Sequence, residues 1–160
     1  MTADSSIDKQ DNPGVVARPP FIYMTALLAG LVLEFFLPTA AMAPPLNYLV
    51  GIGAIGGGLA IMATAIMQFR NAGTNVPTPL PTTAIVTDGI YRFSRNPIYM
   101  ALSLIYAGIG IAADSLWVLV LLAPVLLIVR FGVIAREERY LEEKFGDDYR
   151  RYKDRVRRWF

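Results

Sequence analysis

The chain has 160 residues, and neither cysteine nor histidine is among them. Without cysteine there is no disulfide and no thiolate nucleophile, and without histidine there is no imidazole base or imidazole metal ligand. These absences exclude zinc hydrolases, haem proteins with a histidine ligand, cysteine enzymes and Ser-His-Asp hydrolases. We therefore expect a protein that works without a bound metal.

Charge is scarce as well. Charged residues make up 18% of the chain, compared with roughly 25% in an average soluble protein. Hydrophobic residues make up 54%, and the mean hydropathy is +0.43. The charges gather at the two ends of the chain and in one central loop, as in a membrane protein. The pI of 9.0 therefore reflects basic residues beside apolar segments, and we expect no nucleic-acid partner.

Four apolar segments have about the length needed to cross ~30 Å of hydrocarbon. They cover residues 21–37, 46–69, 97–113 and 116–135. Residues 1–19 are polar and lack the pattern of a cleaved signal peptide, so they are predicted to form a disordered cytoplasmic tail. Residues 20–160 are then a single membrane domain of the all-α class. With four spans, the Lys and Arg residues near the span ends all fall on the side of the membrane that holds both termini. Because such residues favour the cytoplasmic side, both termini are predicted to be cytoplasmic.

Several features within these segments have structural interpretations. Glycines in the second span are spaced for close helix packing, although the pair Gly51-x-Gly53 also resembles a nucleotide contact. Pro124 predicts a kink in the last span. Glu34 is expected either to reach the interface or to point inward. Aromatic and apolar residues at helical spacing predict an amphipathic helix over residues 136–158 at the membrane surface.

The longest polar segment inside the chain, residues 70–96, ends in an unusual cluster. Tyr91, Arg95, Asn96 and Tyr99 stand at the start of the third span, where polar groups are costly unless they bind something or face water. Spans three and four form a hairpin, which returns the chain to the same side. The predicted topology therefore brings this cluster close to Glu137-Glu138. An acidic pair early in a helix also has a purely structural role with the helix dipole.

The segment from Thr83 to Tyr99 has the sequence Thr-Ala-Ile-Val-Thr-Asp-Gly-Ile-Tyr-Arg-Phe-Ser-Arg-Asn-Pro-Ile-Tyr. Together with Glu137-Glu138 and Phe145-Gly-Asp-Asp-Tyr149, it resembles the integral-membrane methyltransferases. These include isoprenylcysteine carboxyl methyltransferases and bacterial phospholipid methyltransferase-like proteins. The resemblance covers about residues 70–155. It implies an enzyme of the bacterial inner membrane that binds S-adenosyl-L-methionine in a pocket facing the cytoplasm, without a Rossmann domain.

The resemblance also implies which residues hold the cofactor. They are Thr83, Ala84, Ile85, Val86, Tyr91, Arg95, Asn96, Pro97, Ile98, Tyr99, Glu137 and Glu138. Asn96 stands where the family usually has histidine. The carboxyl methyltransferases place an arginine shortly before the acidic pair to hold the substrate carboxylate, and Arg130 is the candidate for that anchor.

The implied substrate is a lipophilic acceptor embedded in the membrane, with membrane lipids as the other partner. An isoprenylcysteine-type carboxylate and a phospholipid amine both remain open as acceptors. Two other interpretations remain as well: a non-catalytic four-helix membrane scaffold or small transporter, and a family member that binds the cofactor without catalysing methyl transfer.

Overall fold

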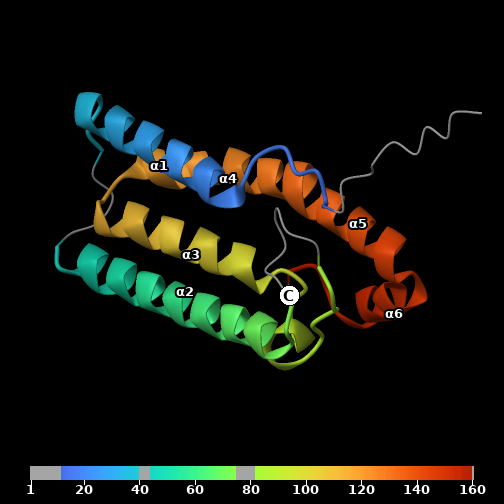
Figure 1. Cartoon of the computed structure of the whole chain (residues 1–160). Coiled ribbons are helices and arrows are strands. Elements are labelled where there is room, and N and C mark those ends of the chain that lie inside the picture. Colours follow the sequence, from blue (N-terminus) through green and yellow to red (C-terminus); the bar gives the residue numbers. More distant parts are fainter. Residues whose placement is uncertain (1–11, 40–43, 75–81, 160) are drawn as a thin grey trace, which may run out of the picture.

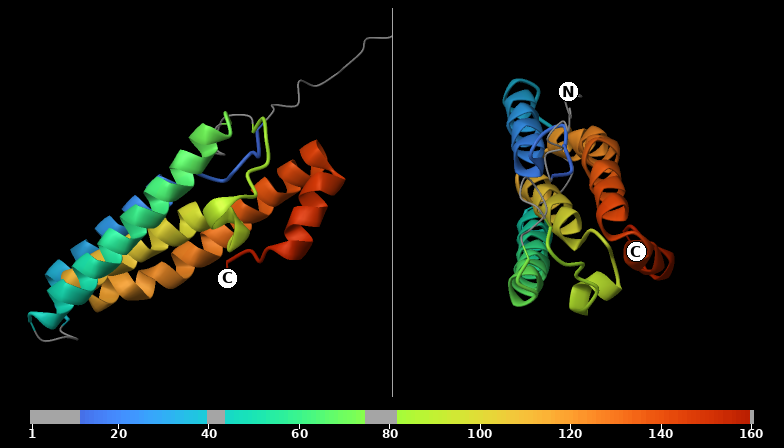
Figure 2. Two further views of the ribbon diagram at one scale, coloured as in Figure 1. Left: turned by 90° about the horizontal axis from the view of Figure 1, so that it is seen from below. Right: turned by 45° about the vertical axis from the view of Figure 1, so that its right-hand side comes forward.

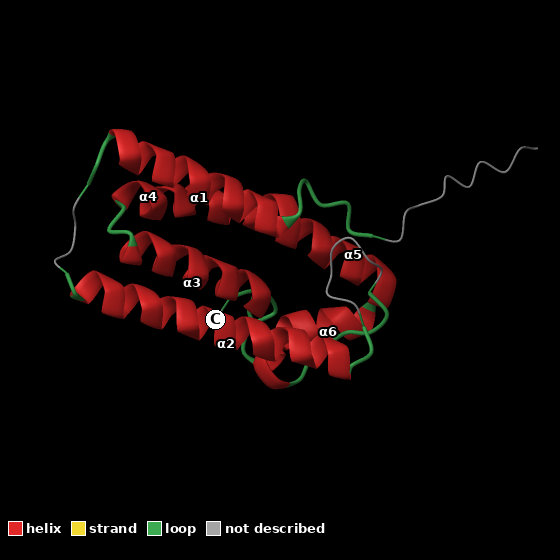
Figure 3. Cartoon of the chain, turned by 60° about the vertical axis from the view of Figure 1, so that its left-hand side comes forward, coloured by secondary structure: helices red, strands yellow, loops and turns green. Residues whose placement is uncertain are grey.

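The computed structural model describes residues 12–39, 44–74 and 82–159, and all regular structure in these ranges is helical (Figures 1 and 3). The elements are α1 (Pro19–Phe36), α2 (Leu46–Asn71), the 3-10 helix η1 (Gly89–Arg92), α3 (Pro97–Ala112), α4 (Leu116–Ile128), the π-helix η2 (Val129–Ile134), α5 (Ala135–Phe145) and α6 (Asp147–Arg155). The all-α prediction is therefore confirmed.

Helix α3 lies at the centre of the bundle. It packs against α2 on one side and against α4 on another, while α1 packs mainly on α4. Figure 2 shows the long helices running side by side, with α5 and α6 extending from one end of the bundle. We call this the α5–α6 end. The loop that precedes α3 lies there too, so it is the end where the predicted site must form.

Among the described residues, three helices are long and apolar enough to cross a membrane: Pro19–Phe36, Leu46–Asn71 and the continuous helix Leu116–Phe145. Helix α3 is apolar too, but it has only 16 residues. Three of the four predicted spans thus have the required length. The crossing of α3 and the cytoplasmic orientation of the termini stay predictions.

Glycines let α2 and α3 approach closely. A Cβ atom at Gly51 would lie 2.6 Å from the backbone nitrogen of Ala112, and one at Gly58 would lie 2.6 Å from Cγ1 of Ile105. On the opposing helix, a Cβ at Gly108 would lie 2.8 Å from the carbonyl oxygen of Gly51. These distances are too short for any side chain. The packing interpretation of the second span therefore holds at these positions.

Two other glycines of α2 do not take part in this contact. A Cβ atom at Gly53 or Gly56 would have nothing within 4 Å. Both residues are exposed on the outer face of the helix. Spacing alone predicted the helix contact but could not separate the glycines that make it from those that do not.

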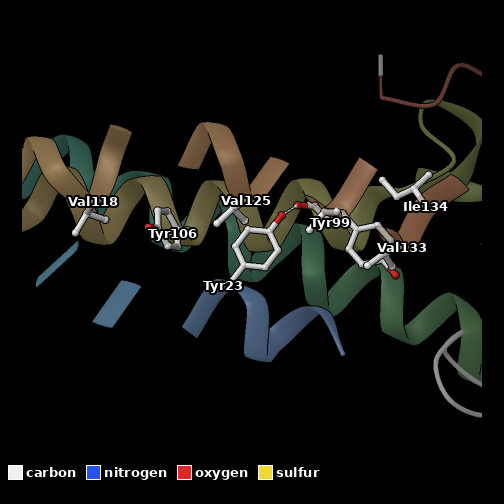
Figure 4. Close-up of a cluster of buried hydrophobic side chains, with 8 residues drawn as sticks. Tyr23, Tyr99, Tyr106, Val118, Val125, Val133 and Ile134 are labelled. Atoms are coloured by element: carbon white, nitrogen blue, oxygen red, sulfur yellow. Dashed lines mark hydrogen bonds between the residues drawn. The ribbon is translucent and has the colours of Figure 1, made fainter. Parts of the chain in front are cut away.

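A core of valines, an isoleucine and tyrosines joins α1, α3, α4 and η2 (Figure 4). The hydroxyl group of Tyr23 is 2.8 Å from Oγ of Ser103 and donates to the carbonyl oxygen of Tyr99 at 3.4 Å. The ring of Tyr23 meets that of Tyr106 edge to face, with centroids 6.0 Å apart. These contacts fix α1 against the first half and middle of α3.

The last long helix contains an irregular turn that the sequence did not predict. The α-helix continues through Pro124, and the irregular turn is η2, at Val129–Ile134. The N-terminal segment crosses this turn, since the amide of Val16 donates to the carbonyl oxygen of Gly132 at 3.2 Å. Part of the predicted disordered tail is therefore ordered, whereas residues 1–11 lie outside the described residues.

The single amphipathic helix expected over residues 136–158 is instead two helices. Gly146 separates α5 from α6 with φ of +55°, a left-handed value that side chains disfavour. The break turns α6 so that Tyr149 and Tyr152 are buried. Aromatic and apolar residues keep their helical spacing across both helices, so the spacing gave no sign of this break. Gly146 was the one signal in the sequence for it.

Glu34 acts at the other end of the bundle. Its carboxylate accepts hydrogen bonds from the amide and the hydroxyl group of Thr39, the latter at 2.7 Å. The same hydroxyl oxygen accepts from the amide of Leu116 at 3.0 Å. Glu34 therefore ties the end of α1 to the start of α4 and plays no part in the site at the α5–α6 end.

Candidate active site

A cavity of about 450 Å³ lies at the α5–α6 end of the bundle. Its walls come from the start of α1, the last turns of α2, the loop over residues 82–86, the segment from η1 into α3, and helices α5 and α6. Segments far apart in the sequence thus meet around one space. Most of its lining is apolar, and the polar groups gather near α5 and α6.

Eleven of the twelve predicted cofactor residues line this cavity. They are Ala84, Ile85, Val86, Tyr91, Arg95, Asn96, Pro97, Ile98, Tyr99, Glu137 and Glu138. Thr83 is the exception, because it is exposed and its amide donates to Oγ1 of Thr74 at 3.0 Å. Its neighbour Thr82 lines the cavity instead.

The two adjacent glutamates have different surroundings. Glu138 is paired with two arginines: Arg158 donates from Nε to Oε1 at 3.0 Å and from Nη2 to Oε2 at 2.6 Å. Arg95 Nη1 lies 3.2 Å from Oε1 of the same carboxylate. Glu138 is therefore neutralised by the protein itself, and it joins α5 to the loop before α3.

Glu137 has no such compensation. It is only 5% exposed, and its Oε1 accepts a hydrogen bond from the hydroxyl group of Tyr99 at 2.7 Å. Among the described residues no Lys or Arg forms an ion pair with it. A buried carboxylate without a cation is costly. Because Glu137 lines the cavity, a cationic or hydroxyl-bearing ligand is the natural partner for it.

Several other polar atoms of the cavity also lack partners. Within the described part of the chain, Oγ1 of Thr82, the hydroxyl group of Tyr91 and Nε of Arg95 are buried without a hydrogen bond or an ion pair. Buried polar groups in proteins are nearly always satisfied, so each of these atoms points to a missing partner. Three donors and one uncompensated carboxylate in an apolar cavity fit a zwitterionic ligand with hydroxyl groups.

Burial also keeps the tyrosines of the site neutral. It raises the pKa of the Tyr91 hydroxyl group well above its usual range, and it raises the pKa of Tyr149 to about 12. The pKa of Tyr152 is raised for the same reason. These hydroxyl groups therefore act as neutral hydrogen-bond donors and acceptors at physiological pH.

The C-terminal segment holds the wall that carries Tyr91 to Asn96. The hydroxyl group of Tyr152 donates to the carbonyl oxygen of Tyr91 at 2.8 Å. The amide of Arg95 donates to the carbonyl oxygen of Arg157 at 3.1 Å, and Nδ2 of Asn96 donates to that of Arg158 at 3.0 Å. The side chain of Asn96 is thus used to bind the C-terminal segment.

Sequence reasoning missed these C-terminal residues and the apolar walls. The walls include Phe21 of α1 and Met62, Ile66 and Phe69 of α2. Phe69 also packs edge to face on Tyr91, with ring centroids 5.2 Å apart. Apolar residues in an apolar helix give no sign of which face meets a cavity. The basic Arg157-Arg158 pair near Trp159 was the available signal for the C-terminal segment.

Arg130 is not brought to this cavity. It is exposed, and it lines a second cavity on another side of α3. Its guanidinium carbon lies 5.3 Å from the ring centroid of Phe131. The role of Arg130 as a substrate anchor therefore has no support from the geometry of the first cavity.

In the described part of the chain, several helices are long and apolar enough to span a membrane, and a part-polar cavity lies at one end of the bundle. Comparison with known proteins identifies the family. Residues 46–148, well over half of the chain, match the family model described as phospholipid methyltransferase. The chain belongs to this family. The predicted membership of a membrane methyltransferase group is thereby confirmed.

Two curated relatives align with parts of the chain. An uncharacterized protein of Haemophilus influenzae is 65% identical over 34 residues, which is 21% of this chain and 54% of the relative. Methanethiol S-methyltransferase 1 of Bradyrhizobium diazoefficiens is 43% identical over 68 residues, which is 42% of this chain and 22% of the relative. The alignments thus span about half of one relative and about a fifth of the other. No solved structure matches the chain.

Proposed function

We propose that this protein transfers a methyl group from S-adenosyl-L-methionine to a lipophilic acceptor that enters from the membrane. The observation that carries the proposal is the cavity around Glu137, in which a buried, uncompensated carboxylate faces donors that lack partners. The family of the chain supports methyl transfer in general. The choice of methyl donor rests on the chemistry of these residues.

The polar groups of the cavity match the parts of this cofactor. Glu137 is the acceptor for the amino group or the ribose hydroxyl groups of the cofactor, and the unpaired Nε of Arg95 is a donor for the cofactor carboxylate. Tyr91 and Thr82 offer further hydrogen bonds, and the apolar loop around Ile85 suits its adenine ring. When bound, the cofactor supplies an activated methyl group on sulfonium. The protein then has to align the acceptor and exclude water.

The acceptor is proposed to reach the cavity between α1 and α2. There the lining is apolar, with Phe21 on α1, Met62 and Ile66 on α2, and Leu102 on α3. Phe21 is 64% exposed on the outside of the bundle. A lipophilic chain in the membrane could follow this wall to the polar part of the cavity. We further propose four membrane spans, with the cavity at the cytoplasmic face of a bacterial inner membrane.

Three acceptor groups fit this scheme. An isoprenylcysteine-type carboxylate is already an anion. A thiol, the group in the name of the Bradyrhizobium relative, and a phospholipid amine must each first lose a proton, for which Glu137 is the buried carboxylate at hand. The family assignment alone does not separate these acceptors.

Cofactor binding is tested by calorimetric titration of the purified protein with S-adenosylhomocysteine. We expect Glu137→Gln and Tyr99→Phe to weaken binding roughly ten-fold or more, since the first removes the negative charge of the site and the second removes the hydrogen bond that holds this carboxylate in place. Glu143→Gln changes an exposed carboxylate of the same helix and should leave affinity unchanged. Thermal unfolding in detergent checks that all three variants stay folded. Unchanged affinity in both site variants would refute the site.

The acceptor is tested with methyl-labelled S-adenosyl-L-methionine, and membrane lipid extract or methanethiol is added as the acceptor. Mass analysis of the labelled product distinguishes a methyl ester, a methylated amine and a thioether. Binding of the cofactor without any labelled product would favour a non-catalytic family member. Failure to bind any S-adenosyl ligand would favour the scaffold or transporter interpretation.

A further inference from the structure

The second cavity is a largely apolar groove of about 590 Å³. Met100, Leu104 and Ala107 of α3 form its floor, together with residues of α2 and α4. Arg130 and Trp159 line it as well. Apart from Trp159 and Arg130, its walls come from apolar parts of the helices. In a membrane, lipid chains surround such walls.

The groove is separate from the methyltransferase cavity. Along α3, which turns once in 3.6 residues, Met100, Ser103, Leu104 and Ala107 fall on one side. Leu102, which lines the first cavity, falls on the opposite side of the helix. The two cavities share no lining residue. An occupant of the groove does not need to be the methyl acceptor.

Arg130 is the residue that gives the groove a chemical preference. Within the described ranges it forms no ion pair with a carboxylate, and its guanidinium group lies over the ring of Phe131. It lies where the apolar part of the long helix gives way to the charged α5. An exposed guanidinium at that level meets lipid head groups, and it binds phosphate oxygens with two parallel hydrogen bonds.

We propose that the groove is a binding site for an anionic phospholipid of the surrounding membrane, with one acyl chain along α3 and the phosphate group at Arg130. The proposal assigns Arg130 a role outside the methyl-transfer site and does not depend on the proposed function. Trp159 closes the groove near the head group, since it packs on the core between α3 and η2. A neutral lipid would fill the apolar groove but would gain less from Arg130.

Trp159 provides the assay, because the chain has only two tryptophans. In a Trp117→Phe background, Trp159 is the sole indole, and acyl chains that carry bromine quench its fluorescence on contact. The full-length protein is reconstituted in equimolar phosphatidylglycerol and phosphatidylcholine vesicles, with bromine on the chains of one lipid or the other. We expect brominated phosphatidylglycerol to be preferred roughly five-fold, as one arginine at a membrane surface provides.

Two variants and one control make the result specific. Arg130→Gln should abolish the preference, whereas Arg70→Gln should keep it, because Arg70 is an exposed arginine at the end of α2 that lines neither cavity. Ala107→Phe should fill the groove and reduce quenching by both lipids. The proposal is overturned if the two lipids quench equally in the parent protein. It is also overturned if Arg130→Gln keeps the preference or if Arg70→Gln abolishes it.

Discussion

The ion pair between Glu138 and Arg158 is predicted to contribute measurably to the stability of the protein. Replacing Arg158 by alanine removes two of the three cationic contacts of the Glu138 carboxylate and leaves Arg95 alone, at 3.2 Å. Glu138 is only 6% exposed, so water cannot fully replace the lost donors. The variant should therefore be destabilised, and the coupling between the two residues should be measurable.

The magnitude follows from the geometry. A hydrogen bond to a charged group contributes about 1.5–3 kcal/mol when it is buried. The Arg158 side chain is 30% exposed, which screens its charge, and Arg95 still partly compensates the carboxylate. We therefore expect Arg158→Ala to cost about 2–3 kcal/mol and the pair to couple by about 2 kcal/mol, below the 3–5 kcal/mol of a fully buried pair.

The assay is a double-mutant cycle with Arg158→Ala, Glu138→Gln and the double variant, each unfolded reversibly in mixed detergent micelles. The pair Asp147–Arg150 serves as control, since its atoms lie 2.8 Å apart but its side chains are 78% and 63% exposed. Its coupling should stay below about 0.5 kcal/mol. A coupling of similar size for both pairs would show that the Glu138 network is no stronger than a surface ion pair, and the reasoning would be wrong.

Two further predictions concern the helix contact and the C-terminal segment. Gly51→Ala should strongly lower the unfolding temperature in detergent, because its Cβ would meet the backbone of Ala112 at 2.6 Å, whereas Gly56→Ala should be neutral or slightly stabilising. Asn96→Ala should cost about 1 kcal/mol by the same measurement, since it removes the donor to the carbonyl oxygen of Arg158. Asn96→His, which also offers a donor, should recover at least half of that loss; no recovery would contradict the assigned role.

The site was predictable from the sequence where residues stood out chemically from their surroundings. Tyr91, Arg95 and Tyr99 are polar groups beside apolar segments, and the hairpin of α3 and α4 fixes which end they share with Glu137. The sequence did not indicate which of the adjacent residues Thr82 and Thr83 lines the cavity, because both are threonines. Only contact with Thr74 decides which of them faces outward.

Other features depend on contacts that no local pattern records. The difference between Glu137 and Glu138 arises from Arg158, which lies 20 residues along the chain and returns only because Gly146 breaks the helix. Likewise, the π-helical turn follows Pro124 by several residues, and the N-terminal segment packs across it through Val16. Periodicity describes single helices well but does not encode such returns.

The surroundings of Asn96 bear on the choice of acceptor. Its side chain donates to a backbone carbonyl oxygen at 3.0 Å, so what this position supplies here is a hydrogen-bond donor that holds the C-terminal segment. The chain has no histidine elsewhere. A base for an ammonium acceptor would therefore have to be a carboxylate, and Glu138 is already paired with two arginines. Glu137 alone would have to both bind the cofactor and take the proton. Under the proposed function, an acceptor that is an anion when it arrives, such as a carboxylate, avoids that conflict and is the better match to this cavity.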